Sequence, residues 1–244
     1  METLWLDIVQ WLHTVGLHVD AGTAREVAGG MAQVTQKLDM PSLLALAAAL
    51  GWASGFRLYA VVFIVGLMGA TGGLALPAGL HVLENPLVLA VAGTLMLVEF
   101  FADKVPWIDS AWDAVHTVIR VPGGALLAAG VFGADNATMG VIAGLLGGSL
   151  AATSMATKMT TRAAVNTSPE PFSNGLVSLF EDGLVVAVVW LATQHPVAFG
   201  VALVVMLVLS VLLMVVLFKF LRAVLRRISS FFGGTQAAVE TNHV

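Results

Sequence analysis

The stretch RAAVNTSPEPFSNGLVSLFEDGLVVAVVW, residues 162–190, joins a polar turn directly to an apolar run. The run continues to residue 193 and starts at 172, close to the roughly 20 residues that a helix needs to cross a bilayer. Ser168-Pro169-Glu170-Pro171 cannot continue a helix, because each proline lacks an amide proton and disfavours helix in the residue before it. The stretch therefore predicts a membrane-spanning helix that follows a proline turn. We expect the turn to fold back onto the cytoplasmic face of the bundle, with an ordinary capped loop as an equal alternative.

The composition of the whole chain also indicates a lipid environment. Of the 244 residues, 58% are hydrophobic and 11% are charged, against about 25% charged in soluble domains. The mean hydropathy is +0.92. The net charge of −4 gives no reason to expect a nucleic-acid partner. The lipid bilayer is the partner that this composition predicts.

The sequence contains no recognisable catalytic or metal-binding motif. It has no cysteine, so disulfides, thiol catalysis and cysteine–metal sites are excluded. Its six histidines are scattered, and it lacks a Walker loop, a His-Glu-x-x-His motif and a Gly-x-Ser-x-Gly motif. We therefore expect no metal, no cofactor and no enzymatic activity.

Apolar runs predict an all-α fold, a polytopic transmembrane helix bundle of about six spans. Five runs come close to the spanning length or exceed it: 42–69, 86–103, 137–157, 172–193 and 197–218. A sixth run, 116–133, is shorter and contains Arg120 and Pro122. We expect it to be a broken or tilted helix, with a re-entrant start as an alternative, so that it need not span fully. The segment 105–115 suits a separate short interfacial helix with a tryptophan anchor.

The basic residues orient these spans. Ten of the eleven Lys and Arg residues precede the first span, lie between spans two and three or four and five, or follow the last. The opposite loops, around 70–85, 134–136 and 194–196, have none. The positive-inside rule then places both termini in the cytoplasm.

The chain divides into three segments on this interpretation. Residues 1–40 contain an N-terminal amphipathic helix at the membrane interface, with apolar residues at helical spacing from Leu4 to Val15. Residues 41–218 form the transmembrane domain. Residues 219–244 form a basic helical extension and a flexible tail.

The two halves of the transmembrane domain show a weak similarity. VEFFAD (98–103) and SLFED (178–182) each place phenylalanine just before an acid, and spans one and four are both rich in small residues. Three spans per half would make the halves an inverted repeat, as in many transporters. Chance similarity between apolar sequences is the alternative.

Small residues recur every four positions in spans one and four. Residues of this kind let helix backbones approach closely in lipid. The partner of each stripe is either another helix of the chain or a second copy in a homo-oligomer. The stripes are Ala45, Ala49 and Ala53, and Gly140, Gly144, Gly148, Ala152 and Ala156.

Charged and polar side chains inside the spans are the candidate functional residues. Arg57 lies near the middle of span one, where an arginine costs roughly 2.5–3.5 kcal/mol, so it must face protein or water. Glu99 is its better predicted partner, and Asp103 alternatively marks a span end. Asn174, Ser178 and Asp182 form a stripe in span five. The candidate pathway for a solute or ion comprises Arg57, Glu99, Asp103, Lys158, Arg162, Glu170, Asn174, Ser178, Glu181 and Asp182.

These same residues carry a resemblance. ASGFRLY (53–59), EFFADKVPWIDSAWD (99–113), the Arg120-Val-Pro-Gly-Gly turn and above all NTSPEPFSN (166–174) with Glu181-Asp182 resemble an uncharacterised prokaryotic membrane family, domain-of-unknown-function family 4126. The resemblance covers roughly residues 42–218. It implies a multi-pass protein of the prokaryotic inner membrane and assigns no substrate or catalytic residue.

Three functional hypotheses follow from these residues. The first is a small transporter or channel for an ion or polar solute, lined by the intramembrane charges. The second is a membrane scaffold or accessory subunit, in which ion pairs such as Arg162 with Glu181 or Asp182 only hold the bundle together. The third and weakest is an intramembrane enzyme that uses a carboxylate pair on a lipid.

Overall fold

The computed structural model describes residues 39–133, 136–167 and 171–240, and every secondary-structure element within these ranges is helical. The all-α prediction is confirmed for this part of the chain. The elements are α3 (Met40–Ala70), the 3₁₀ helix η1 (Ala78–Glu84), α4 (Pro86–Ala102), α5 (Pro106–Phe132), α6 (Ala137–Val165), α7 (Pro171–Gln194) and α8 (Pro196–Glu240). The predicted amphipathic helix near the N-terminus, Glu170 and the last four residues lie outside the described residues.

Local sequence explains where several helices begin. Asp39 accepts a hydrogen bond from the backbone N–H of Ser42 at 3.0 Å, Asn85 accepts one from Leu87 at 2.9 Å, and Asn136 accepts one from Met139 at 3.1 Å. Each bond satisfies an amide that has no partner inside its helix. Hydrogen bonds from the Ser42 hydroxyl and from its backbone N–H stabilise the ionised carboxyl of Asp39 and lower its pKa. Proline in the first turn adds a fixed φ to α3, α4 and α5.

Five helices are long and apolar enough to cross a membrane, namely α3, α5, α6, α7 and α8. A sixth candidate is η1 with α4, two helices that meet at an angle of 68°. The predicted number of spans therefore agrees with the helices by length and composition. Exposed apolar side chains along α7 and α8, such as Leu179, Val204 and Leu212, suit contact with a bilayer.

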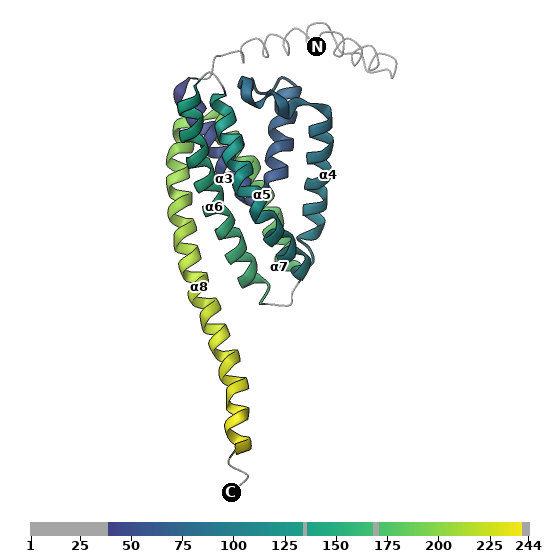
Figure 1. The fold of residues 1–244 in the computed structure, drawn as a ribbon, viewed down its shortest axis with the longest axis vertical. Helices are drawn as coiled ribbons and strands as arrows, with labels where there is room; N and C mark the ends of the chain where they lie inside the picture. The colour runs from purple at the N-terminus through teal and green to yellow at the C-terminus, as the bar shows by residue number, and fades with distance from the viewer. Residues whose placement is uncertain (1–38, 134–135, 168–170, 241–244) are drawn as a thin grey trace, which may run out of the picture.

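Helix α3 does not run straight through the bundle, which differs from the single crossing predicted for 42–69. Arg57 has φ −146° and ψ 74°, outside the helical region, and it divides α3 into a first limb, 40–56, and a second limb, 58–70. The first limb packs against α6, and the second leads back to η1, where Gly66 lies against the backbone of Leu83. Both ends of α3 therefore lie at the same end of the bundle (Figure 1).

Helix α5, in contrast, is continuous where the sequence predicted a break. It is one continuous helix of 27 residues that includes both the predicted interfacial segment and the run 116–133. Pro122 lies inside it. Pro122 removes one backbone hydrogen bond, but a membrane helix tolerates this where neighbouring helices pack around it. Here Gly123 lies against Leu58 of α3 and Gly124 lies against Ala151 of α6. The break that the sequence predicted in the third span occurs in the first.

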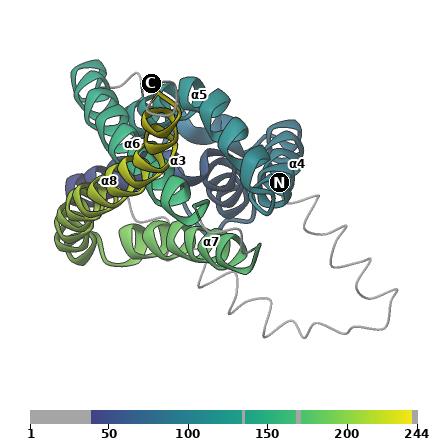
Figure 2. The same cartoon turned by 90° about the horizontal axis from the view of Figure 1, so that it is seen from below.

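Close backbone contacts hold α3 at the centre of the bundle, with α5, α6, α7 and α8 around it (Figure 2). A Cβ atom on Gly51 of α3 would lie 2.5 Å from Cα of Gly147 in α6. The predicted stripe at Gly140, Gly144 and Gly148 lies against α5 of the same chain. These small residues thus have intramolecular partners.

The predicted inverted repeat is not confirmed. Helix α3 bends at Arg57, whereas α6, its counterpart in the second half, continues unbroken over 29 residues. Helix α8 extends for 45 residues, about 68 Å, and projects well beyond the other helices (Figure 1). It passes through the basic residues Lys219, Arg222, Arg226 and Arg227.

Candidate functional site

The bend in α3 brings Arg57 into a cluster of ionisable side chains, which we call the charge cluster. It contains four cations, Arg57, Arg120, Lys158 and Arg162, and six carboxyl groups, Glu99, Asp103, Asp109, Asp113, Glu181 and Asp182. These residues come from α3, α4, the turn after α4, α5, α6 and α7. Nine of the ten are at most 2% exposed, and the side chain of Asp182 is 32% exposed.

Arg57 connects the bend of α3 to α7 and to the turn after α4. Its Nη2 lies 2.6 Å from Oδ2 of Asp103, and its Nε lies 3.0 Å from Oδ1 of Asp182. Nη2 also donates to the hydroxyl of Ser178 at 2.7 Å, and that hydroxyl donates to Asp103 at 3.3 Å. Lys158 donates to the carbonyl oxygen of Phe56, directly before the break, at 3.3 Å. Contacts from distant parts of the chain therefore stabilise the non-helical backbone at Arg57.

Arg120 organises the α5 side of the charge cluster. Its guanidinium forms ion pairs with Glu99 and with Asp113, the latter at 2.7 Å. Nζ of Lys158 lies 3.2 Å from Asp113 and 3.7 Å from Glu99. Two cations and two carboxylates thus neutralise one another away from water, as buried charges must.

Arg162 connects α6 to the start of α7. Its Nη2 lies 2.9 Å from Glu181 and 3.2 Å from Asp103. Its Nη1 donates to the carbonyl oxygens of Asp103 and Asn174, both at 3.4 Å. The amide of Asn174 donates in turn to Asn166 at 3.0 Å. These contacts fix the first turns of α7 against α6.

The structure brings together nearly all the residues that the sequence singled out. Arg57, Glu99, Asp103, Lys158, Arg162, Asn174, Ser178, Glu181 and Asp182 all contribute contacts to the charge cluster, and Glu170 lies outside the described residues. The ion pair between Arg162 and Glu181 is present. The pairing predicted between Arg57 and Glu99 is wrong, because Glu99 binds Arg120 and Arg57 binds Asp103 and Asp182. Asp103 does not merely mark a span end, since it accepts from α3, α6 and α7.

The polar face of α5 was not predicted from the sequence. Asp109, Asp113, His116 and Arg120 follow one another at helical spacing and are all buried. That spacing is a signal that could have been found, but the tryptophans of the same segment indicated an interfacial helix. Nδ1–H of His116 donates to the carbonyl oxygen of Trp112 at 2.8 Å, and the two rings stack with their centroids 4.1 Å apart.

Four hydroxyl side chains, spaced four residues apart along α6, bond within their own helix. Ser149, Thr153, Thr157 and Thr161 each hydrogen-bond the backbone carbonyl four residues earlier. Such bonds satisfy a hydroxyl within its own helix. Within the described ranges, no group of three or more His, Asp or Glu side chains is arranged to hold a metal ion.

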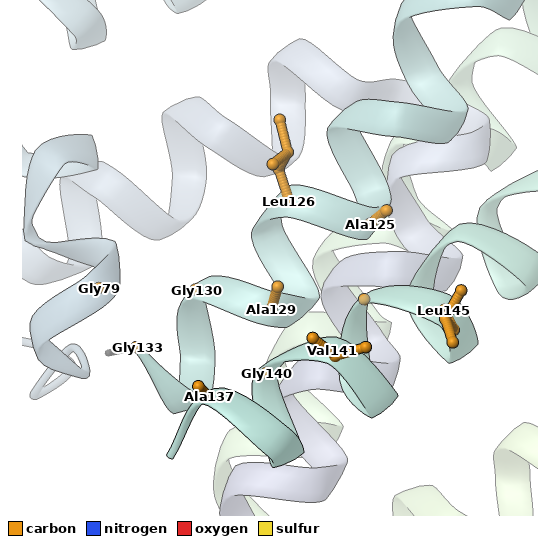
Figure 3. A pocket seen from close by; sticks show the side chains of 11 residues that line it. Gly79, Ala125, Leu126, Ala129, Gly130, Gly133, Ala137, Gly140, Val141 and Leu145 are labelled. Carbon is orange, nitrogen blue, oxygen red and sulfur yellow. The ribbon is translucent and has the colours of Figure 1, made fainter. Parts of the chain in front are cut away.

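A second concave feature lies at the opposite end of the bundle and has no polar side chain. An open groove of about 650 Å³ runs between η1, α5 and α6 (Figure 3). Its lining consists of glycine, alanine, valine and leucine, including Gly79, Ala129 and Val141. This apolar lining suits a hydrocarbon chain and offers no partner to a polar ligand. The charge cluster is therefore the better candidate site.

The domain of unknown function DUF4126 matches residues 44–216. The chain belongs to this family. The resemblance inferred from the motifs around Arg57, Asp103 and Asn174 is thereby confirmed. No curated protein and no solved structure matches the chain. Because the match contains the entire charge cluster, the cluster belongs to the family domain and not to the segments outside it.

Proposed function

We propose that this integral membrane protein is a small transporter for an ion or polar solute, and that the charge cluster is its solute site in a closed conformation. The observation that carries the proposal is the break at Arg57 of α3. Broken helices inside a membrane are tolerated where protein or a cavity satisfies their backbone, and transporters commonly bind solute at such breaks. Charges buried within spans are functional by default.

The pairing pattern suggests an anionic solute. Arg57 and Arg162 are held by Asp182 and Glu181, the two adjacent acids of α7. In the closed state these carboxylates occupy the positions that a solute anion would take on the two guanidiniums. Protonation of Glu181 and Asp182 would leave Asp103 as the carboxylate that both arginines share, and each guanidinium could then bind a solute anion. Solute entry and proton uptake would thereby be coupled.

Helix α7 is the element best suited to open the site. Its outer face exposes Leu176, Leu179 and Phe180, each at least 65% accessible, as expected for a helix against lipid. Its inner face contacts the charge cluster through Ser178, Glu181 and Asp182. Because these contacts are polar, the loss of a few ion pairs would free the first half of α7. Asp182, the most exposed member, lies where a solute would enter.

The proposed location is the prokaryotic inner membrane, with the end that contains Lys104, Lys158 and the basic part of α8 in the cytoplasm. This orientation agrees with the predicted cytoplasmic C-terminus. Asp39, however, lies at the opposite end of the bundle because α3 turns back at Arg57. The predicted cytoplasmic N-terminus required α3 to cross the bundle once. Because α3 turns back, that prediction loses its support.

The alternative proposal is a membrane scaffold or accessory subunit. One observation favours it: each of the four cations already has a carboxylate within 3.2 Å, as a purely structural network would require. The basic projection of α8 would then bind a partner or anionic lipid. A second copy of the chain is a further proposed partner, and neither proposal includes an enzymatic step.

Flux in proteoliposomes tests the transport proposal. The full chain would be reconstituted with a pH-sensitive dye inside, and chloride, nitrate, phosphate and succinate would be supplied outside in turn. We expect at least one anion to move with protons faster than in protein-free liposomes. The flux should be lost in Arg57→Gln and retained in Lys104→Gln, which removes an exposed cation beside the Phe100 ring. Folded protein that moves none of the anions and no protons would favour the scaffold.

A further inference from the structure

Asp109 is the one member of the charge cluster without a close cation. It is fully buried, and neither of its carboxyl oxygens has a hydrogen-bond partner. The nearest cation, Nη1 of Arg162, lies 3.9 Å from its Oδ2. Each of the other five carboxyl groups has an arginine nitrogen within 3.0 Å. Asp109 is therefore the one carboxyl group of the charge cluster without an arginine nitrogen at hydrogen-bonding distance.

Arg162 is not available to pair with Asp109 in this conformation. Its Nη1 donates to two backbone carbonyls, and its Nη2 faces Glu181 and Asp103. An ionised carboxyl that is buried without hydrogen bonds is strongly unfavourable. The position of Asp109 in the first turn of α5 favours its anion, but only by the small effect of a helix terminus.

The other groups that face Asp109 are acids. The Asp103 carboxyl, in the turn after α4, is within hydrogen-bonding reach of it, and Asp113 follows one turn later on α5. Oδ1 of Asp103 also has no hydrogen-bond partner. Two carboxyl groups that face each other can form a hydrogen bond only when one of them carries a proton.

We infer that Asp109 is a proton-binding site, which holds a proton when the charge cluster is closed and donates it in a hydrogen bond to Asp103. When Arg162 leaves Glu181, its guanidinium is free to approach Asp109 and to stabilise the carboxylate. The proton then passes from the carboxyl oxygen to water. Its role as the coupling proton rests on the proposed function, whereas the protonation itself does not.

Infrared spectroscopy of the full chain in lipid tests this inference without any transport assay. A protonated buried carboxyl gives its own C=O stretching band, separate from those of carboxylates and amides. We expect the band in wild-type protein at neutral pH, its loss in Asp109→Asn, and its retention in Asp113→Asn. Asp113 is the matched control, because it is equally buried one turn away but lies 2.7 Å from Arg120. Absence of the band from the wild type, or its persistence in Asp109→Asn, would overturn the inference.

Thermal unfolding provides a second and independent measurement. Asparagine has the shape of a neutral aspartic acid, so Asp109→Asn should fold and keep the wild-type melting temperature. Asp113→Asn should melt at a lower temperature, because Arg120 and Lys158 lose a counter-charge. If Asp109→Asn is as unstable as Asp113→Asn, or does not fold, the carboxyl is ionised and the inference fails. A failed flux assay with a positive infrared result would reject transport and leave the proton site intact.

Discussion

Both ends of the bundle contain buried side chains, but they depend on different interactions. Toward the end that contains both termini of α3, Gly51 of α3 and Gly147 of α6 bring two helix backbones together, with Ala128 of α5 beside them. We call this part of the bundle the small-residue end, and the part around the charge cluster the charged end. At the other end, ten ionisable side chains replace this packing. The small-residue end has little freedom to rearrange, because a side chain at Gly51 would meet the backbone of Gly147. The charged end allows several, because Lys158 and Arg162 each lie within 4.0 Å of more than one acid. The difference indicates that the first end holds the fold and the second can rearrange.

A leucine in place of Gly51 should destabilise the fold more than any change at the charged end. Even its Cβ would lie 2.5 Å from Cα of Gly147, and backbone atoms cannot move aside as a side chain can. We expect no folded protein, measured as the yield of monodisperse protein after extraction in mild detergent. Gly183→Leu is the control, since no atom lies within 4 Å of a Cβ at Gly183. Equal yields from the two variants would contradict tight packing at the small-residue end.

Removal of one buried cation should have the next largest effect. Arg120→Leu leaves Glu99 and Asp113 without their closest partner, and breaking a buried ion pair costs about 3–5 kcal/mol. The loss would appear as a lower apparent melting temperature in detergent or lipid. Lys104→Leu removes a charge at the same end but from an exposed side chain, and it should leave the melting temperature close to that of the wild type. Similar losses in both would mean that the charge cluster is hydrated.

Loss of the Ser178 hydroxyl should have an intermediate effect. The hydroxyl bridges Arg57 and Asp103, and a hydrogen bond to a charged group contributes about 1.5–3 kcal/mol. Ser178→Ala should therefore lower the melting temperature less than Arg120→Leu does. Ser149→Ala serves as the matched change, because the Ser149 hydroxyl only bonds the carbonyl of Leu145 in its own helix. A Ser178 variant as stable as the Ser149 variant would remove the bridge from the account.

Neutralisation of Asp182 should have the smallest effect on stability. Its side chain is 32% exposed and contacts Arg57 alone among the cations, so solvent screens the pair. We expect Asp182→Asn to cost about 0–1 kcal/mol in unfolding experiments, well below the cost of Arg120→Leu. A loss as large as that of Arg120→Leu would show that the charged end is as rigid as the small-residue end.

The spans could be predicted from the sequence because length and apolarity decide whether a helix crosses a bilayer. The bend in α3 could not, because Arg57 lies within an unbroken apolar pattern. The contacts that stabilise its non-helical backbone come from two residues far away in the chain. Lys158 donates to the carbonyl oxygen of Phe56, and Ser178 accepts from Arg57. The proline of α5 suggested a break there, but packing by neighbouring helices keeps α5 continuous.

The candidate residues could be found, since a charge inside an apolar run is visible by itself, but their pairing could not. Glu99, in the last turn of α4, and Asp103, directly after that helix, are four residues apart, and the sequence does not say which of them faces α3 and which faces α5. The acids of α5 recur at helical spacing and would have been recognised if the segment had been considered as part of a spanning helix.

Access of water to Ser178 decides whether the charge cluster opens on the α7 side. Because the chain has no cysteine, Ser178→Cys, Leu179→Cys and Thr167→Cys can each be made in the natural background. A membrane-impermeant thiol reagent would be added to vesicles from the side of the basic residues. Thr167 is exposed beyond the end of α6, and Leu179 is exposed on the outer face of α7, where we expect lipid to cover it.

We expect complete labelling of Thr167→Cys, none of Leu179→Cys, and slow labelling of Ser178→Cys that becomes faster when Asp182→Asn is added. If Ser178→Cys stays unlabelled in both backgrounds while Thr167→Cys reacts fully, the charge cluster is a permanently closed structural network and the transport account is wrong.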